Sequence, residues 1–81
     1  MIYALKVNDY NLFVKEYYIS SQDKDRHLHI VYTDKPEMAL TFNYIEDAAL
    51  HLTFIWGNSS SSDTTAAALC IAEAQTYYKE L

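Results

Sequence analysis

The stretch Asn43-Tyr-Ile-Glu-Asp-Ala-Ala-Leu-His-Leu-Thr-Phe-Ile-Trp-Gly57 decides the fold that we expect for this chain. Asn43 is a favourable N-cap residue, and Glu46 stands three residues later, which is the spacing of a capping box. Gly57 can adopt the left-handed conformation that ends many helices. The sequence therefore predicts a helix that is capped at Asn43 and stopped at Gly57.

Apolar residues inside this stretch recur at intervals of three and four positions. They are Ile45, Ala48, Ala49, Leu52, Ile55 and Trp56. This spacing places them on one helical face, which we expect to pack on the core. Leu50 and Phe54 widen the apolar side, so the sequence predicts a helix that is buried around much of its girth.

The N-terminal part of the chain has the alternation of β-strands. Residues 1–7 alternate, residues 12–20 are rich in aromatic and β-branched side chains, and residues 8–11 have turn chemistry. These features predict an antiparallel hairpin. Residues 21–26 form a polar and charged segment that is typical of an exposed loop. Residues 27–33 alternate again and predict a third strand.

The remaining segments predict two further helices. Asp34 is a candidate N-cap, Pro36 suits a first helical turn and Glu37 has the capping-box position, so we expect a short helix over residues 35–40. A serine-rich loop over residues 58–62 follows the central helix. Residues 63–81 carry an apolar helical stripe and predict a C-terminal helix, although residues 69–77 also fit a strand.

These elements together predict one α+β domain that spans residues 1–81. We expect an antiparallel sheet of three to four strands, packed by the central helix and a C-terminal helix.

Composition narrows the classes of function. The formal net charge is −5 and no basic patch is visible, so direct nucleic-acid binding is not expected. Cys70 has no partner for an internal disulfide, and the N-terminus lacks the pattern of a signal peptide. No run of about 18 apolar residues suggests a membrane span. We therefore expect a cytoplasmic protein that does not contact a membrane.

No arrangement of residues predicts catalysis or cofactor binding. His27 and His29 share a strand face that His51 could join, but metal sites need three or four convergent ligands, and this spacing is common by chance. Cys70 lies in an apolar context where a thiol behaves as a small core residue. The serine run at residues 59–62 lacks a glycine-flanked nucleophile elbow. We expect no metal, no cofactor and no enzymatic activity.

Residues 32–48 resemble a pattern in small accessory proteins of phages and mobile elements of Gram-positive bacteria. The resemblance rests on Thr33, Asp34, Ala39, Phe42, Glu46, Asp47 and Ala48. It implies a β-hairpin, a further strand and then a helix. Such proteins often end in a short strand after a glycine, whereas a serine-rich loop follows Gly57 here. Some small phage proteins bind and inhibit host defence enzymes, as anti-CRISPR proteins do, so the resemblance implies such a role in the host cytoplasm.

Tyrosines and acidic residues are the candidate binding groups. Eight tyrosines exceed what a small core requires, and tyrosine is enriched where proteins bind proteins. Acidic residues cluster at the predicted helix starts, where the alternative explanation is that they complement helix dipoles. The candidate contact residues are Tyr10, Tyr17, Tyr18, Asp34, Glu37, Asp47, Tyr77 and Tyr78. We expect a non-enzymatic protein-binding module with a basic partner; the alternative is a homo-oligomeric assembly protein, for example a homodimer.

Overall fold

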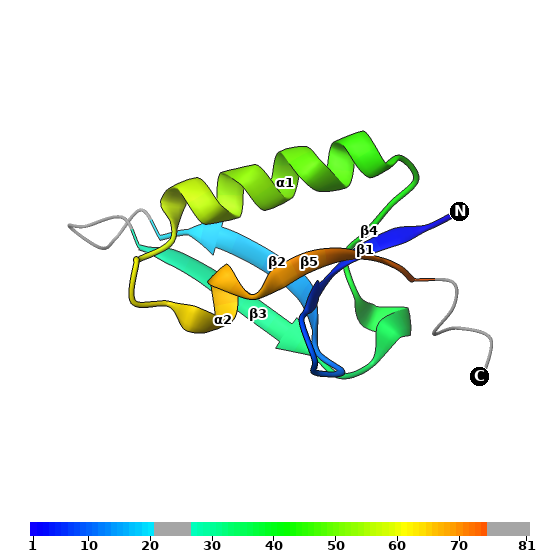
Figure 1. The fold of residues 1–81 in the computed structure, drawn as a ribbon, viewed down its shortest axis with the longest axis horizontal. Helices are drawn as coiled ribbons and strands as arrows, with labels where there is room; N and C mark the ends of the chain where they lie inside the picture. Colours follow the sequence, from blue (N-terminus) through cyan, green and yellow to red (C-terminus); the bar gives the residue numbers. More distant parts are fainter. Residues whose placement is uncertain (21–26, 75–81) are drawn as a thin grey trace.

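The computed structural model describes residues 1–20 and 27–74. It has an α+β fold, as predicted, in which one long helix lies along an antiparallel sheet (Figure 1). The elements in chain order are β1 (Tyr3–Val7), β2 (Phe13–Ile19), β3 (Leu28–Thr33), the 3₁₀ turn η1 (Pro36–Met38), β4 (Thr41–Phe42), α1 (Ile45–Asn58), α2 (Thr64–Ala67) and β5 (Leu69–Glu73).

The five-stranded sheet of the described residues is built around β1. Its strand order is β3-β2-β1-β4, and β5 also pairs with β1. β5 runs antiparallel to β1 along its whole length, from Tyr3 opposite Glu73 to Val7 opposite Leu69. β2 and β4 therefore share the other edge of β1, with β2 beside Lys6 and β4 beside Tyr3. The sheet thus has more strands than the three or four that we predicted.

The strands predicted in the first half of the chain are confirmed. β1 and β2 form the expected antiparallel hairpin, and Asp9 in their turn has a positive φ of 67°. This conformation suits Asp, whose short polar side chain tolerates the left-handed region. β3 pairs with β2 in antiparallel register, with an irregularity between Val14 and Glu16. The predicted loop at residues 21–26 lies outside the described residues.

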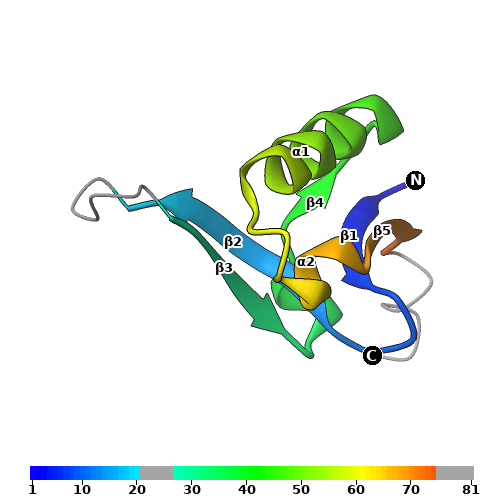
Figure 2. The same ribbon diagram turned by 60° about the vertical axis from the view of Figure 1, so that its left-hand side comes forward.

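Side chains on the two faces of the sheet form two buried clusters. α1 covers one face, where it contributes Ala48, Leu52 and Ile55 (Figures 1 and 2). The sheet and α2 supply the rest of this main core, namely Leu5, Val7, Val14, Phe42, Ala66 and Leu69. Ala4, Phe13 and Ala74 form the second cluster. Because neighbouring residues of a strand point to opposite faces, this cluster lies on the side away from α1.

The predicted ends of the central helix are wrong. α1 begins at Ile45, its N-cap is Tyr44 in an extended conformation, and no side chain caps it. Asn43 lies one residue before the cap position and directly follows β4, which ends at Phe42. Gly57 lies inside the last turn, and the helix ends one residue later.

The predicted C-terminal helix is also wrong for the part of it that the structure describes. Only α2 is helical, with Asp63 as its N-cap, and β5 follows as a strand. The strand alternative was therefore right for Leu69–Glu73, while the rest of that segment lies outside the described residues. Alanine has the highest helix propensity, but propensity is a weak determinant of structure, and pairing along the whole edge of β1 outweighs it.

The helix predicted at residues 35–40 is a single 3₁₀ turn. Pro36 does occupy its first turn, as predicted. Its N-cap is Lys35 with no side-chain hydrogen bond, so the predicted cap at Asp34 is wrong. The chain leaves this turn in an extended conformation at Ala39 and enters β4, which stops any longer helix.

Candidate protein-binding surface

Large apolar side chains remain exposed along α1. Leu50 keeps 69% of its surface accessible, and Phe54 and Trp56 keep 43% and 49%. The prediction that this helix is buried around much of its girth is therefore wrong, because the sheet covers only one side of it. We call the exposed set the α1 outer surface, and its members are Tyr44, Ile45, Leu50, Phe54 and Trp56.

The α1 outer surface has two flanks. Leu50 and Phe54 are one turn apart, and the ring of Phe54 lies 5.8 Å from that of Tyr17 on β2. Ile45 and Trp56 are eleven residues apart, which brings them to within about 20° of each other around the helix axis. Trp56 bonds to α2, so this second flank faces the opposite side of α1. We call the side with Leu50 and Phe54 the β2 flank and the side with Ile45 and Trp56 the α2 flank.

A hydrogen bond between Tyr17 and His51 anchors the β2 flank. The Tyr17 hydroxyl lies 2.6 Å from His51 Nδ1, and the His51 ring packs 4.7 Å from the ring of Phe42. Burial raises the pKa of Tyr17 above its usual value. Tyr17 therefore acts in this structure as a partly buried link between β2 and α1.

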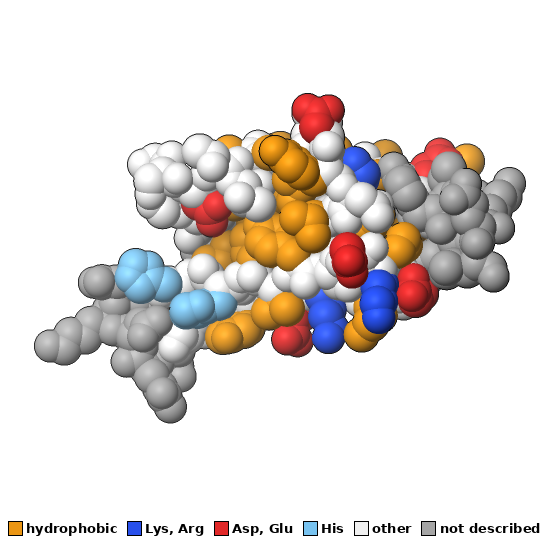
Figure 3. Space-filling model, turned by 90° about the horizontal axis from the view of Figure 1, so that it is seen from below, with side chains coloured by type: hydrophobic (Ala, Val, Ile, Leu, Met, Phe, Trp, Pro, Cys, Tyr) orange, Lys and Arg blue, Asp and Glu red, His pale blue; other side chains and the backbone are white. Residues whose placement is uncertain are grey.

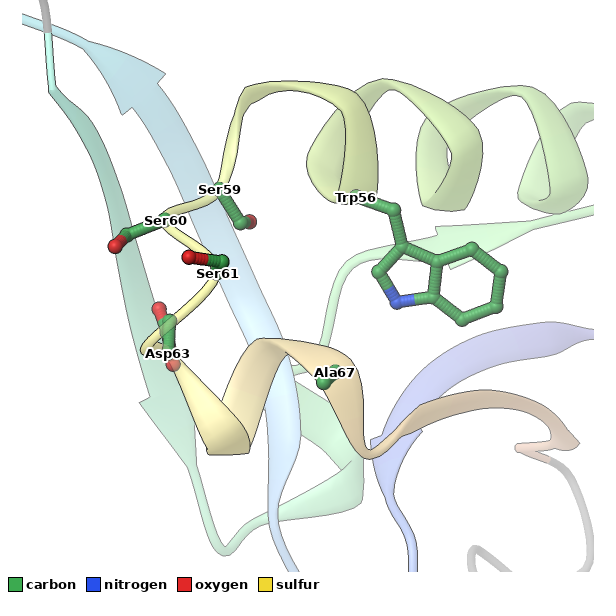
Figure 4. Close-up of a pocket in the computed structure, with 6 residues that line it drawn as sticks. All are labelled: Trp56, Ser59, Ser60, Ser61, Asp63 and Ala67. Carbon is green, nitrogen blue, oxygen red and sulfur yellow. The ribbon is translucent and has the colours of Figure 1, made fainter.

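The α2 flank contains a hollow of about 380 Å³ (Figure 4). Its lining residues are Trp56, Ser59, Ser60, Ser61, Asp63 and Ala67. The indole Nε1–H of Trp56 donates to the Ala66 carbonyl at 2.9 Å. The Ala66 backbone N–H donates in turn to Asp63 Oδ1 at 3.0 Å, which caps α2. Two hydrogen bonds to one residue thus fix Trp56 and Asp63 at the hollow.

Our sequence reasoning missed this hollow. The signal for its lower wall was present, since Asp63 precedes Thr-Thr-Ala-Ala as an N-cap precedes a short helix. The apolar stripe over residues 63–81 instead predicts one long C-terminal helix. No sequence signal indicates that Trp56 folds over α2, because that contact depends on how the loop of residues 59–63 turns the chain back.

The candidate tyrosines within the described residues do not form one surface. Tyr10 is exposed in the turn between β1 and β2. Tyr18 is exposed on β2 and stacks on His29, with ring centroids 5.2 Å apart, whereas its neighbour Tyr17 faces α1. Successive residues of a strand point to opposite faces, so these two tyrosines cannot contact the same partner surface. Tyr77 and Tyr78 lie outside the described residues.

The candidate acidic residues are also dispersed. Asp34, Glu37 and Asp47 are all exposed. Asp34 and Glu37 belong to the η1 region and Asp47 to the first turn of α1, and Figures 1 and 2 place these elements on opposite sides of β1. Glu46 and Asp47 lie at the positive end of the helix dipole, which supports the alternative explanation for that pair.

Charge is distributed unevenly along the chain. No Lys or Arg occurs between Lys35 and Lys79. The same stretch contains Glu37, Glu46, Asp47, Asp63 and Glu73. Within it, α1 carries Glu46 and Asp47, Asp63 caps α2, and neither helix contains Lys or Arg. On the face turned away from α1, lysine and acidic side chains both lie around a central group of hydrophobic side chains (Figure 3).

The histidines and the cysteine occupy separate places. His51 lies on the α1 side of the sheet, bonded to Tyr17, while His29 stacks on Tyr18 on the other side. Among residues 1–20 and 27–74, no three His, Cys, Asp or Glu side chains are grouped as metal ligands. Cys70 is half-buried in β5, and its Sγ lies 3.4 Å from the Lys6 carbonyl oxygen.

Comparisons with known proteins find no matching protein-family model, no matching curated protein and no matching solved structure. In the part of the chain that the structure describes, no helix combines the length and hydropathy needed to cross a membrane.

Proposed function

We propose that this chain is a non-enzymatic protein-binding module and that the α1 outer surface is its contact region. The observation that carries the proposal is the exposure of Leu50, Phe54 and Trp56 on a helix whose opposite side already completes the core. Exposed apolar side chains of this size commonly mark interaction sites, and tryptophan is enriched among the residues that dominate binding energy.

The surrounding charges specify the kind of partner. Glu46, Asp47 and Asp63 are exposed along the same segment, and no Lys or Arg of that segment offsets them. A partner with an apolar centre and a basic rim would complement this surface. The acidic residues would speed association at low salt, while the apolar contacts would slow dissociation and depend less on salt.

Homo-oligomeric assembly is the second candidate function. Among the described residues, β3 pairs only with β2 and β5 pairs only with β1, so each strand offers an edge to another chain. Light scattering over a range of concentrations separates the two candidates. A monomer supports partner binding, whereas an oligomer that persists in a Leu50→Ser, Phe54→Ser variant supports assembly through a strand edge.

Affinity capture tests the proposed function directly. The resemblance to phage accessory proteins makes the lysate of a Gram-positive bacterium the first source of partners to test. The wild-type chain, the Leu50→Ser, Phe54→Ser double variant and a Tyr18→Ser control on the opposite face would serve as baits. We expect the wild type and the control to enrich the same protein and the double variant to lose it.

Surface plasmon resonance on the purified partner then gives the size of the effect. We expect the double variant to bind about tenfold or more weakly, mainly through faster dissociation, as for loss of a central apolar contact. Circular dichroism of each variant checks that the fold is intact. Unchanged affinity of a correctly folded double variant would show that α1 is not the contact region.

A further inference from the structure

We infer that the hollow between the last turn of α1 and α2 receives an arginine side chain of the protein partner. This inference rests on the proposed function, since it assigns one contact within the proposed binding surface. The hollow presents an aromatic ring and a carboxylate to a common space, and Figure 4 shows the Trp56 side chain reaching from α1 toward α2 with Asp63 at the start of α2.

Trp56 supplies a rigid aromatic platform. Its Nε1–H is already bonded to the Ala66 carbonyl, so the ring has no donor left for a ligand. About half of the side chain is nevertheless exposed, which leaves the aromatic ring itself as the binding element. A guanidinium group stacks well on an indole ring because it is planar, cationic and weakly hydrated.

Asp63 supplies the negative charge. Its Oδ1 accepts one hydrogen bond from the Ala66 backbone N–H, and a carboxylate has further acceptor positions on both oxygens. The Asp63 charge also acts on a second residue of the fold, Tyr32. The pKa of Tyr32 on β3 is raised first by burial and then by the nearby carboxylate of Asp63. Asp63 is exposed, so an incoming cation can reach its carboxylate from solvent.

The other lining groups give shape more than charge. The Ser59 hydroxyl donates to the Ile55 carbonyl, and the Ser60 and Ser62 hydroxyls are 2.8 Å apart and hydrogen-bonded. Ala67 adds a small apolar surface. A volume of about 380 Å³ lies near the lower end of the range for ligand pockets, which suits one long side chain entering from outside.

The chemistry favours arginine over other occupants. An anion would meet the Asp63 carboxylate, and a purely apolar side chain would leave that charge without a partner. Lysine carries a compact, strongly hydrated charge that cannot stack on Trp56 and bond Asp63 with one planar group, whereas arginine can.

Trp56 makes the experiment specific because it is the only tryptophan in the chain. Its indole N–H resonance, followed by two-dimensional NMR of the full-length chain, reports on this hollow alone. The probes are blocked arginine (acetyl-Arg-amide), blocked lysine and blocked citrulline, the last being a neutral analogue of arginine. We expect a saturable shift with blocked arginine and about tenfold weaker binding of blocked citrulline, since the cation–π and carboxylate contacts are lost.

Asp63→Asn is the matched variant. Asparagine also caps helices through its side-chain oxygen, so α2 should persist while the charge is removed. We expect this variant to bind blocked arginine about tenfold more weakly. The comparison with blocked citrulline needs no variant, so it decides the question even if Asp63→Asn alters the fold.

Three results would overturn the inference. These are an absence of saturable shifts with blocked arginine, equal binding of blocked citrulline, and equal or tighter binding of blocked lysine. Failure here is distinguishable from failure of the proposed function. If arginine does not bind but partner capture still depends on Leu50 and Phe54, only the hollow is wrongly assigned. If arginine binds but capture ignores those residues, the proposed contact region is wrong.

Discussion

Leu50 and Leu52 have the same side chain and lie two positions apart on α1, yet their environments are opposite. Leu50 is 69% exposed, whereas Leu52 is 6% exposed and belongs to the main core. Two residues correspond to about 200° around the helix, so one points away from the sheet when the other points into it. Whether a hydrophobic residue of α1 is buried or exposed therefore depends on whether it faces the sheet.

Truncation of these two leucines should have very different effects on stability. Leu52→Ala removes methyl groups from a packed core, and we expect it to lower the free energy of unfolding by about 2–5 kcal/mol. Leu50→Ala should change it by no more than about 0.5 kcal/mol, because Leu50 is exposed. Urea unfolding of both variants measures the difference. Equal losses would mean that α1 is rotated relative to this structure.

A second comparison concerns the N-caps of α1 and α2. Asp63→Ala removes the side chain that accepts the Ala66 N–H, and it should cost about 1 kcal/mol. Asn43→Ala should leave stability unchanged within error, because no side chain caps α1. Thermal denaturation of the two variants side by side gives the result. A larger loss of stability for Asn43→Ala than for Asp63→Ala would support the capping box that the sequence predicts.

Removal of the hydrogen bond between Tyr17 and His51 should have a smaller effect on stability. Tyr17→Phe keeps the ring and removes the hydroxyl that bonds His51, and we expect a loss of about 0.5–1.5 kcal/mol. Tyr18→Phe, on the opposite face, is the matched control and should be close to neutral. Chemical denaturation at neutral pH compares them. Equal effects would show that the Tyr17–His51 contact adds nothing to the attachment of α1.

Raising the pH into the alkaline range should have the smallest effect on stability. Burial raises the pKa of Tyr17, and burial together with the Asp63 charge raises the pKa of Tyr32. A raised pKa in the folded state means that stability is retained below the ordinary pKa of 10.0 and falls as the pH rises above it. Unfolding measured on both sides of that pH should show this decline. Tyr32→Phe should make it shallower, and an unchanged decline would argue against the raised pKa.

The sequence alone determined the elements whose signals are local. Alternation between neighbouring residues indicates β1, β2 and β3, the Asn-Asp turn joins the first two, and periodic apolar residues indicate α1. These signals survive folding because strand and helix geometry relate residues that are close along the chain. For the candidate site, the sequence points to tyrosines and acidic residues. It does not single out Leu50, Phe54 or Trp56, because their apolar pattern predicts burial against the core.

Only the tertiary structure decided where the C-terminal segment goes and which residues meet at the surface. β5 is a strand because the edge of β1, more than sixty residues earlier in the chain, offers it a full set of backbone partners; Lys6 lies opposite Cys70. The exposed side of α1 and the meeting of Trp56 with Asp63 likewise follow from the position of the sheet and the turn of a loop. Contacts between residues far apart in the chain leave no periodic trace in the sequence, so local pattern could not reveal them.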